Sequence, residues 1–477
     1  MTASPSVSRR RFLAWSAAAS AAAVAACVPT TVLPSEGRPP TSATPVTAPV
    51  PSGSAAPNRK PAPIPTPSTA PSPSPAAGRR RTLYRDGALA DGRSDRLRLG
   101  VSILVEDGVI RWIRPADDEG PTGRGAQLRV IDASGSTLVP GLVDAHSHLT
   151  MPGGARWIDR GFDPPERLVE VAEANAVLLG RAGVRWARDV GAPRGRDPVD
   201  GRERALSLGL RDRWRGIPGY PMIRAAGTWI TRRGSLPAGL TVEVGSGDAL
   251  RRAALGQLED GADLVKLYLD GPDTDHAPWS VAEVRRVVEA VHARGARVTA
   301  HASRLSGARV GAEAGVDALE HGFELDADVA QTMAEKGVAL VSTLAVFRSW
   351  LTFGRTTRLP RFATEDGRRA IRERQEAAEA AIRIANRAGV AIAAGTDFGG
   401  GSTRANQLAW EVEALVEAGL EPWQALGAAT WRGGELLGEA EAGVIHEGGP
   451  ADFSLVHGDP TSDPTALWRV WHVAWLD

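Results

Sequence analysis

The stretch LVPGLVDAHSH, residues 138–148, is an apolar run that ends in two histidines separated by one residue. Side chains two positions apart on a β-strand point to the same side, so His146 and His148 face one spot at the carboxyl end of this strand. Two imidazoles aimed at one spot are a metal-binding geometry. Taken alone, the pair also fits two structural histidines, and the choice between these interpretations depends on the rest of the chain.

Apolar strand-like runs alternate with amphipathic helical stretches from residue 138 to about residue 437. Helical patterns cover residues 165–182, 280–294 and 364–388. Eight strands with intervening helices predict an α/β fold of the (β/α)8 TIM-barrel type, and a doubly wound open sheet is the alternative. The expected strands are TLVPGLVDAH (137–146), VRWARDV (184–190), PMIRAAG (221–227), DLVKLYL (263–269), RVTAHA (297–302), ALEHG (318–322), VALVSTL (338–344) and VAIAAGTD (390–397).

Side chains that can ligate metal or carry charge stand on five of these strands, at positions that a barrel turns toward its active site. Each histidine alone could be structural, but their joint placement favours one site. His276, in the loop after the fourth strand, is a further candidate for lining the pocket. The main candidates are His146 and His148 on the first strand, Lys266 on the fourth, His301 on the fifth, His321 on the sixth and Asp397 on the eighth.

Both ends of the folded part of the chain have the pattern of short strands. Residues 83–113 contain strand-like runs broken by Asp-Gly pairs at 86–87, 91–92 and 107–108, and the last pair, between SILVE and VIRWI, is a strong hairpin signal. The final VWHVAWLD predicts a short last strand. We therefore expect β-rich parts at residues 81–139 and 441–477, and the alternating α/β part at residues 140–440.

The first 80 residues have the pattern of an export signal followed by a spacer. SRRRFL, residues 8–13, resembles a twin-arginine signal, and VAA before Cys27 resembles a bacterial lipobox. Residues 1–27 thus predict a lipoprotein signal with lipid attachment at Cys27, although a buried thiol is the alternative. Residues 28–80, rich in Pro, Ser and Thr, predict a disordered linker. We expect an exported protein that is anchored by lipid to the bacterial cell membrane and faces away from the cytoplasm.

Charge and cysteine content exclude some partners. Lysine plus arginine and aspartate plus glutamate number 56 each, so no net field recruits nucleic acid. The single cysteine excludes a disulfide within the chain. We expect a small-molecule partner, contact with the membrane through the lipid anchor only, and leave a homo-oligomer open.

The order and context of VDAHSH, VKLYL, VTAHA, LEHG and AAGTD resemble the binuclear-metal amidohydrolase superfamily, most closely its imidazolonepropionase-like and metal-dependent prolidase-like branch. The resemblance runs from about residue 83 to the C-terminus. It implies a metal-bearing barrel and a composite β-sandwich made from both ends of the folded chain. It also implies two metal ions, one held by His146, His148 and Asp397 and the other by His301 and His321, with Lys266 bridging both as a carbamate.

Lys266 supports the carbamate independently of the resemblance. It is one of three lysines in the chain and lies among apolar residues in LVKLYL, where an ammonium is costly to bury and cannot ligate a cation. Burial and nearby cations lower the pKa of the amine, which frees it to react with carbon dioxide and become an anionic oxygen ligand. The alternative is an ion pair between Lys266 and a carboxylate such as Asp263 or Asp270.

The implied ligand set favours zinc, with iron, manganese or cobalt as alternatives. The implied reaction is hydrolysis of an amide, either peptide-like, N-acyl or cyclic, by a hydroxide shared between the two ions. Asp397 would accept the proton of the hydroxide and deliver it to the leaving nitrogen. The alternatives are a lactone or phosphotriester hydrolase on the same site, a single-metal deaminase, and a catalytically silent surface binding protein.

The substrate pocket departs from the prolidase-like pattern in two places. Ser303 stands where prolidase-like members often carry Tyr or His, two residues after the fifth-strand histidine, and TWITRRGSLP stands where they often carry Gly-Gly-His. Both changes put Xaa-Pro dipeptidase activity in doubt. In that loop Arg232 and Arg233 are candidates for binding a substrate carboxylate, and a solvated basic loop is the alternative.

Overall fold

The computed structural model describes residues 80–120, 122, 128–400 and 403–476. The twin-arginine signal, Cys27 and nearly all of the linker predicted for residues 28–80 lie outside this range, so those expectations stay predictions. Within the described residues, no helix combines the length and apolar character needed to cross a membrane.

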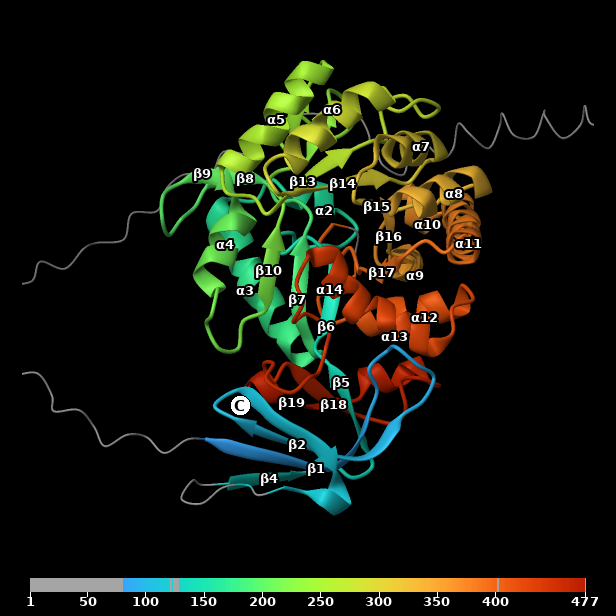
Figure 1. The fold of residues 1–477 in the computed structure, drawn as a ribbon. Helices are drawn as coiled ribbons and strands as arrows, with labels where there is room; N and C mark the ends of the chain where they lie inside the picture. The colour runs from blue at the N-terminus through green and yellow to red at the C-terminus, as the bar shows by residue number, and fades with distance from the viewer. Residues whose placement is uncertain (1–79, 121, 123–127, 401–402, 477) are drawn as a thin grey trace, which may run out of the picture.

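Strands from both ends of the described chain share one sheet, called here the composite sheet (Figure 1). Its strand order is β19-β18-β5-β1-β2-β3, and β4 also pairs with β1. Its buried side chains include Tyr84, Ile103, Leu138 and Phe453. The strands are β1 (Arg81–Leu89), β2 (Arg98–Glu106), β3 (Val109–Pro115), β4 (Leu128–Asp132), β5 (Ser136–Pro140), β18 (Phe453–His457) and β19 (Val470–Val473). The last strand is short, as predicted.

Two of the Asp-Gly pairs behave differently from each other. Asp107 and Gly108 have φ of 51° and 78° and connect the antiparallel strands β2 and β3, which confirms the predicted hairpin. The expectation that Asp86-Gly87 also separates two strands is wrong. Strand β1 continues through this pair with a register shift against β2, and Asp86 has a φ of 59°. The pair therefore forms an irregularity within one strand rather than a turn.

The opening stretch contains two strands where one was expected. β5 ends at Pro140 and pairs with β18 antiparallel, whereas β6 (Leu142–Ser147) pairs with β7 (Val184–Asp189) parallel. Gly141, between them, donates from its backbone N–H to the carbonyl of Asp452 at 2.8 Å. A Cβ at Gly141 would lie 2.7 Å from the Cβ of Arg185, so only glycine fits this crossing without a shift. The chain thus passes from the composite sheet into the parallel strands within one residue.

The middle of the chain is an α/β fold of parallel strands and helices. One sheet has the order β10-β7-β6 and another has the order β12-β11-β13-β14-β15-β16-β17. Isolated parallel bridges join Ala226 to Leu264 and Ser147 to Phe398. The strands are β7 (Val184–Asp189), β10 (Met222–Ala225), β11 (Ile230–Arg232), β12 (Val242–Val244), β13 (Leu264–Tyr268), β14 (Arg297–Ala302), β15 (Ala318–His321), β16 (Ala339–Ser342) and β17 (Ile392–Ala394), with the separate pair β8 (Arg194–Arg196) and β9 (Glu203–Ala205).

Helices surround these parallel strands in Figure 1, and the composite sheet lies below them. The three predicted helical stretches are confirmed as α3, α6 and α11, and Ser280 forms a capping box at the start of α6. The helices are α2 (Trp157–Arg160), α3 (Pro165–Arg181), α4 (Leu206–Trp214), α5 (Gly247–Glu259), α6 (Val281–His292), α7 (Leu305–Ala314), α8 (Ala327–Lys336), α9 (Ala345–Thr352), α10 (Pro360–Ala363), α11 (Glu365–Arg387), α12 (Leu408–Glu417), α13 (Pro422–Ala428) and α14 (Trp431–Leu437).

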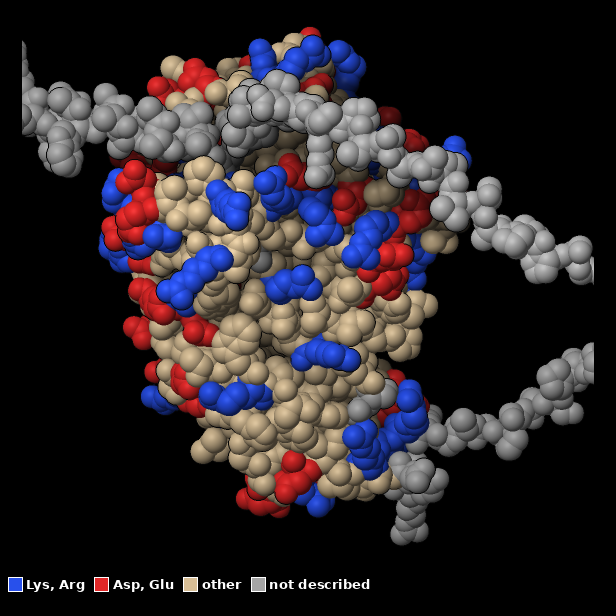
Figure 2. All heavy atoms as spheres, turned by 180° about the vertical axis from the view of Figure 1, so that it is seen from behind, with Lys and Arg blue, Asp and Glu red and all other residues tan. Residues whose placement is uncertain are grey.

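The charged surface agrees with the balanced composition. Figure 2 shows basic side chains as separate groups among uncharged ones on one face of the molecule, with acidic side chains toward its edges.

Candidate metal centre

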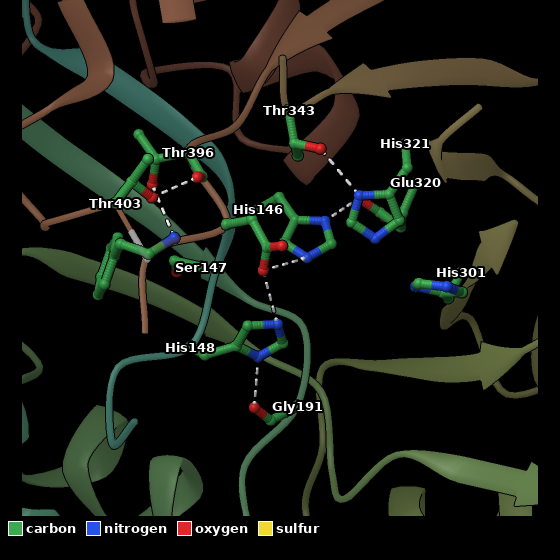
Figure 3. Close-up of polar contacts among 12 residues, drawn as sticks. His146, Ser147, His148, Gly191, His301, Glu320, His321, Thr343, Thr396 and Thr403 are labelled. Carbon is green, nitrogen blue, oxygen red and sulfur yellow. Dashed lines mark hydrogen bonds and ion pairs between the residues drawn. The ribbon is translucent and has the colours of Figure 1, made fainter. Parts of the chain in front are cut away.

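The structure brings all six main candidates to one cavity at the carboxyl ends of the parallel strands. His146 lies in β6, and His148 follows the end of that strand. Figure 3 shows the rings of His146 and His321 next to each other, with His148 and His301 on either side. Lys266 comes from β13, His301 from β14, His321 from β15, and Asp397 from the loop after β17.

The ligand atoms lie close enough together to share a cation. Asp397 Oδ1 is 3.4 Å from Nε2 of His146 and 3.3 Å from Nε2 of His148. The ring centroids of His146 and His321 are 4.7 Å apart, and those of His301 and His321 are 4.5 Å apart. His146, His321 and Asp397 each offer a ligand atom within 4.8 Å of the others. This group can hold a metal ion.

Three of the imidazoles are oriented by partners behind them. Nδ1 of His146 contacts Glu320 Oε2 at 2.6 Å, and Nδ1 of His321 contacts Thr343 Oγ1 at 2.8 Å (Figure 3). Nδ1 of His148 donates to the carbonyl of Gly191 at 2.8 Å. A donating Nδ1–H fixes the tautomer and leaves the Nε2 lone pair for a metal ion. His146 and His148 thus direct Nε2 toward Asp397.

Glu320 is the buried carboxylate behind His146. Its Oε1 accepts from Arg188 at 2.5 Å, and Glu320 and Arg188 are 0% and 3% exposed. Although burial opposes its charge, Arg188 holds the pKa of Glu320 well below its ordinary value. Glu320 is therefore ionised and accepts the proton of His146 Nδ1. Glu320 immediately precedes His321 in the quoted LEHG, and only the fold reveals its contact with His146.

His301 is held in a different way from the other three histidines. Its Nε2 lies 3.1 Å from Asp270 Oδ2 and 3.3 Å from Ser303 Oγ. Its ring stacks on that of Tyr268, with centroids 3.9 Å apart and an interplanar angle of 8°. Since Nε2 is engaged by Asp270 and Ser303, Nδ1 is the nitrogen left for a metal ion. Ser303 consequently contacts a candidate ligand as well as lining the cavity.

Lys266 is buried at 2% exposure, and its Nζ has no hydrogen-bond partner among the described residues. Burial lowers the pKa of its ammonium to about 8. Neither alternative ion pair of Lys266 forms among the described residues: Asp263 Oδ2 accepts from Arg211 at 2.8 Å, and Asp270 Oδ2 contacts His301. An unpartnered buried amine is costly. Conversion into a metal-bound carbamate would give Nζ the partner that the protein does not provide.

The backbone is unusual at two of the candidate ligands. His321 and Asp397 have φ of 76° and 52°, in the left-handed region that non-glycine residues seldom adopt. The backbone N–H of Asp397 donates to the carbonyl of His146 at 2.8 Å. A Cβ at Gly395 would lie 2.7 Å from the backbone nitrogen of His146, so glycine permits this close approach. Such strain is typical of functional positions.

The chemistry of these residues fits divalent cations. Burial and the neighbouring His301 hold the pKa of His321 well below its ordinary value, and burial also lowers the pKa of His301. Both rings are therefore neutral, which is the ligating form. Burial opposes the charge of Asp397, but His146 and His148 hold its pKa well below its ordinary value. The neutral rings of His301 and His321 and the carboxylate of Asp397 are donors that suit zinc-like ions.

The cavity has mainly apolar walls, which the sequence analysis did not identify. Arg374 of α11 also lines it, and no sequence signal separated this residue from the other arginines of its helix. The apolar and aromatic lining residues are Trp157, Ile158, Trp229, Leu236, Leu240, Tyr268, Phe323, Val346 and Trp350.

The other predicted substrate-binding residues do not line this cavity. Arg232 donates to the carbonyl of Gly245, and Arg232 and His276 line a different surface hollow. His276 has an 80% exposed side chain that pairs with Asp273 at 2.9 Å, and Arg233 is exposed. Of the four candidates, Ser303 alone is among the described residues that line the cavity.

The α/β fold and the His/Asp group define a metal-binding α/β protein. The profile of the amidohydrolase family matches residues 137–473, and the chain belongs to this family. It is accordingly an enzyme, a hydrolase of carbon–nitrogen bonds, as the sequence predicts.

Three relatives illustrate this placement. An uncharacterized protein of Mycobacterium tuberculosis (strain ATCC 25618 / H37Rv) is 31% identical over 384 residues, covering 79% of this chain and 94% of that protein. An imidazolonepropionase of Salinispora arenicola (strain CNS-205) is 28% identical over 393 residues, covering 76% of this chain and 86% of that protein. The crystal structure of a Xaa-Pro dipeptidase with bound methionine matches with a TM-score of 0.69 and 25% identity, covering 83% of this chain and 99% of that chain. The predicted superfamily branch is confirmed.

Proposed function

We propose that the chain is a metal-dependent amide hydrolase whose six strand-end residues hold two divalent ions. His146, His148 and Asp397 would hold one ion, His301 and His321 the other, and a carbamate on Lys266 would bridge them. The observation that carries this proposal is the buried Lys266 Nζ, which has no partner among the described residues yet lines the same cavity as the five other donors. A single-metal deaminase has no need of such a lysine.

We further propose that the eight main parallel strands close into a barrel and that the composite sheet is a separate β-domain. Bridges between Ala226 and Leu264, and between Ser147 and Phe398, support closure because they join the two sheets at different edges. In a closed barrel the carboxyl ends of all strands surround one opening. This arrangement would bring all the candidate ligands to the same opening.

When bound, the two ions would polarise a carbonyl oxygen and make water nucleophilic at neutral pH. Zinc suits the donor set best. Asp397 lines the cavity and would move the proton. Its carboxylate accepts a proton from the attacking water as the new C–O bond forms, and delivers it to the leaving nitrogen as the C–N bond breaks. Glu320 keeps His146 oriented, and the apolar walls exclude bulk water.

The full chain, stripped of metal by a chelator and then reloaded with zinc, tests this function. The substrates are dipeptides, N-acyl amino acids and cyclic amides, with lactones as the contrasting class. We expect zinc-dependent hydrolysis of at least one amide class. Equal amide hydrolysis by the stripped and reloaded proteins would contradict metal dependence. Hydrolysis of lactones alone would assign the site to the alternative reaction.

A further inference from the structure

We propose that Arg374 is a specificity-determining residue that binds a carboxylate of the substrate. The inference rests on the proposed function and deepens it, because it defines the substrate class. The substrate would be an amide that carries one carboxylate and a bulky apolar group. Three features of the molecule support this role: the apolar cavity walls, the lack of an acidic partner for Arg374 among the described residues, and the position of Arg374 relative to the candidate ligands.

The cavity walls favour an apolar substrate that carries one anionic group. Among the described lining residues, Arg374 is the only charged side chain apart from the six candidate ligands. The remaining walls are mostly tryptophan, leucine and other apolar side chains. Apolar walls accept an aromatic or branched group, whereas the few polar groups of a pocket determine orientation and specificity. Arg374 is the polar group available for that purpose.

Arg374 lacks the acidic partner that its neighbours on α11 have. Arg368 and Arg372 both pair with Glu365, at 2.8 and 2.7 Å, and Arg369 pairs with Asp366 at 2.7 Å. No carboxylate among the described residues lies within ion-pair distance of Arg374, which is half-buried. A half-buried guanidinium that lines a cavity and has no carboxylate within ion-pair distance among the described residues favours an anionic ligand.

Aromatic contacts place Arg374 near the candidate ligands. Its Cζ lies 5.7 Å from the ring centroid of Phe323, and the Phe323 ring is 5.4 Å from that of His321. Phe323 is fixed in turn by Phe347, at 4.7 Å between centroids. The guanidinium is thus one aromatic ring away from a candidate ligand. A substrate of moderate size can place its amide at the candidate centre and its carboxylate at Arg374.

The planar fork of an arginine matches a carboxylate, which accepts two parallel N–H bonds. One guanidinium also balances the single charge of a carboxylate. Arg232 and Arg233, the arginines that the sequence suggests for this role, do not line the cavity. Arg374 comes from a different element, α11, the last of the helices between β16 and β17.

Matched pairs of amides test the proposal directly. The first pair is N-benzoyl-leucine and N-(3-methylbutyl)benzamide, which lacks only the carboxylate. The second places the carboxylate on the acyl side, as N-(3-methylbutyl)succinamic acid and N-(3-methylbutyl)butanamide. Steady-state kinetics on the zinc-loaded full chain give kcat/KM for each compound. Calorimetry on the zinc-loaded Asp397→Asn protein, in which turnover is suppressed, gives binding independently of activity.

We expect the acid of at least one pair to be favoured about 10- to 100-fold in both measurements, as for a charge-assisted hydrogen bond. Arg374→Gln removes that preference without weakening the neutral compound, and Arg374→Lys restores part of it. Arg372→Gln, on the same helix but paired with Glu365, is the matched control and keeps the preference.

Acids bound no better than their neutral partners, or an acid preference that survives Arg374→Gln, would overturn the proposal. So would a complete lack of acid binding. These outcomes are distinct from failure of the proposed function. If the wild type hydrolyses neither member of a pair yet binds the acid through Arg374, amide hydrolysis of these compounds fails and the role of Arg374 stands. If both members are hydrolysed equally and Arg374→Gln changes neither rate, amide hydrolysis stands and the proposed role of Arg374 fails.

Discussion

Asp397 contacts two candidate ligands and also faces the cavity. Its Oδ1 lies 3.3 Å from His148 Nε2 and 3.4 Å from His146 Nε2. A carboxylate in this position can ligate an ion and exchange a proton with a substrate. These two roles can be separated, because an amide oxygen still offers a ligand atom but does not accept a proton as a carboxylate does.

Asp397→Asn is therefore expected to lower kcat by about 100- to 10,000-fold while most of the bound metal is retained. The measurements are steady-state kinetics and elemental analysis of the same preparation. Asp273→Asn, at an exposed carboxylate, is the control and keeps wild-type turnover. Full activity in metal-replete Asp397→Asn would exclude Asp397 as the group that moves the proton.

Lys266 provides a second test at the residue scale. If its amine becomes a carbamate, protein equilibrated with ¹³C-bicarbonate shows a carbamate carbon signal in NMR spectra. Lys266→Ala removes this signal, lowers metal content and abolishes turnover, and short carboxylic acids restore part of the activity by replacing the bridging oxygens. Lys336→Ala is the control, since Lys336 is exposed and contacts the carbonyl of Glu313. A zinc-loaded, active protein without the signal would contradict the carbamate.

How well each of these residues could be predicted depends on whether local sequence or tertiary packing fixes its position. His146 and His148 could be paired from the sequence because strand alternation fixes their common side. Lys266 was conspicuous because lysine is rare in this chain and is costly to bury. Arg374 could not be identified, since it lies on a helix that carries several other arginines. Which of them faces a cavity depends on tertiary packing rather than on local sequence.

At the scale of elements, α9 and α12 are joined by a buried carboxyl. Glu411 of α12 accepts from Ser342 Oγ at 2.5 Å and from the backbone N–H of Ala345, the first residue of α9, at 2.6 Å. Helix α9 carries Val346 and Trp350 of the cavity wall. Burial raises the pKa of Glu411 to about 7 from its ordinary 4.5. The contact that joins α9 of the cavity wall to α12 therefore depends on pH.

Because the folded protein holds the Glu411 proton more tightly than the unfolded chain, the stabilising contribution of this carboxyl is complete below pH 4.5 and is lost as pH rises toward 7. The loss is on the order of 3 kcal/mol. Glu411→Gln does not titrate, so its denaturation midpoint should fall less than that of the wild type across this range. Glu376→Gln, at an exposed position on α11, is the control. If the denaturation midpoints of the wild type and Glu411→Gln fell equally with rising pH, Glu411 would not be the group responsible.

Element boundaries were predictable where local signals are strong. The periodicity of α3, α6 and α11 located their ends within two residues. The crossing at Gly141 was not predictable, because β5 and β6 form one continuous apolar run whose partners come from distant parts of the chain. The irregularity at Asp86-Gly87 was not predictable for a similar reason, since the same dipeptide forms a hairpin turn or an irregularity within a strand depending on the partner strand.

At the scale of the whole molecule, the composite sheet connects the two ends of the described chain. Phe453 of β18 is fully buried, and its ring meets that of Tyr84 of β1 edge-on at 4.8 Å. Strand β18 also pairs with β5, which leads directly into β6 and the candidate ligands His146 and His148. The composite sheet thus supports the start of the strand that carries the candidate metal site.

Phe453→Ala should destabilise the protein by about 3–5 kcal/mol, because it leaves a cavity between the two chain ends. The measurement is the midpoint of chemical denaturation. Val130→Ala, on the same sheet but 47% exposed, is the control and should cost less than about 1 kcal/mol. Equal midpoints for the two variants would mean that the chain ends contribute little to folding.

The metal content of the purified, active full chain, measured by elemental analysis together with amide hydrolysis, tests the two-metal site most directly. We expect two divalent ions per chain, with hydrolysis that rises as both sites fill and is lost on chelation. One ion per chain at full activity would contradict the bridging role of Lys266 and favour a single-metal enzyme. No bound ion in a protein that still binds its substrate would contradict the account as a whole.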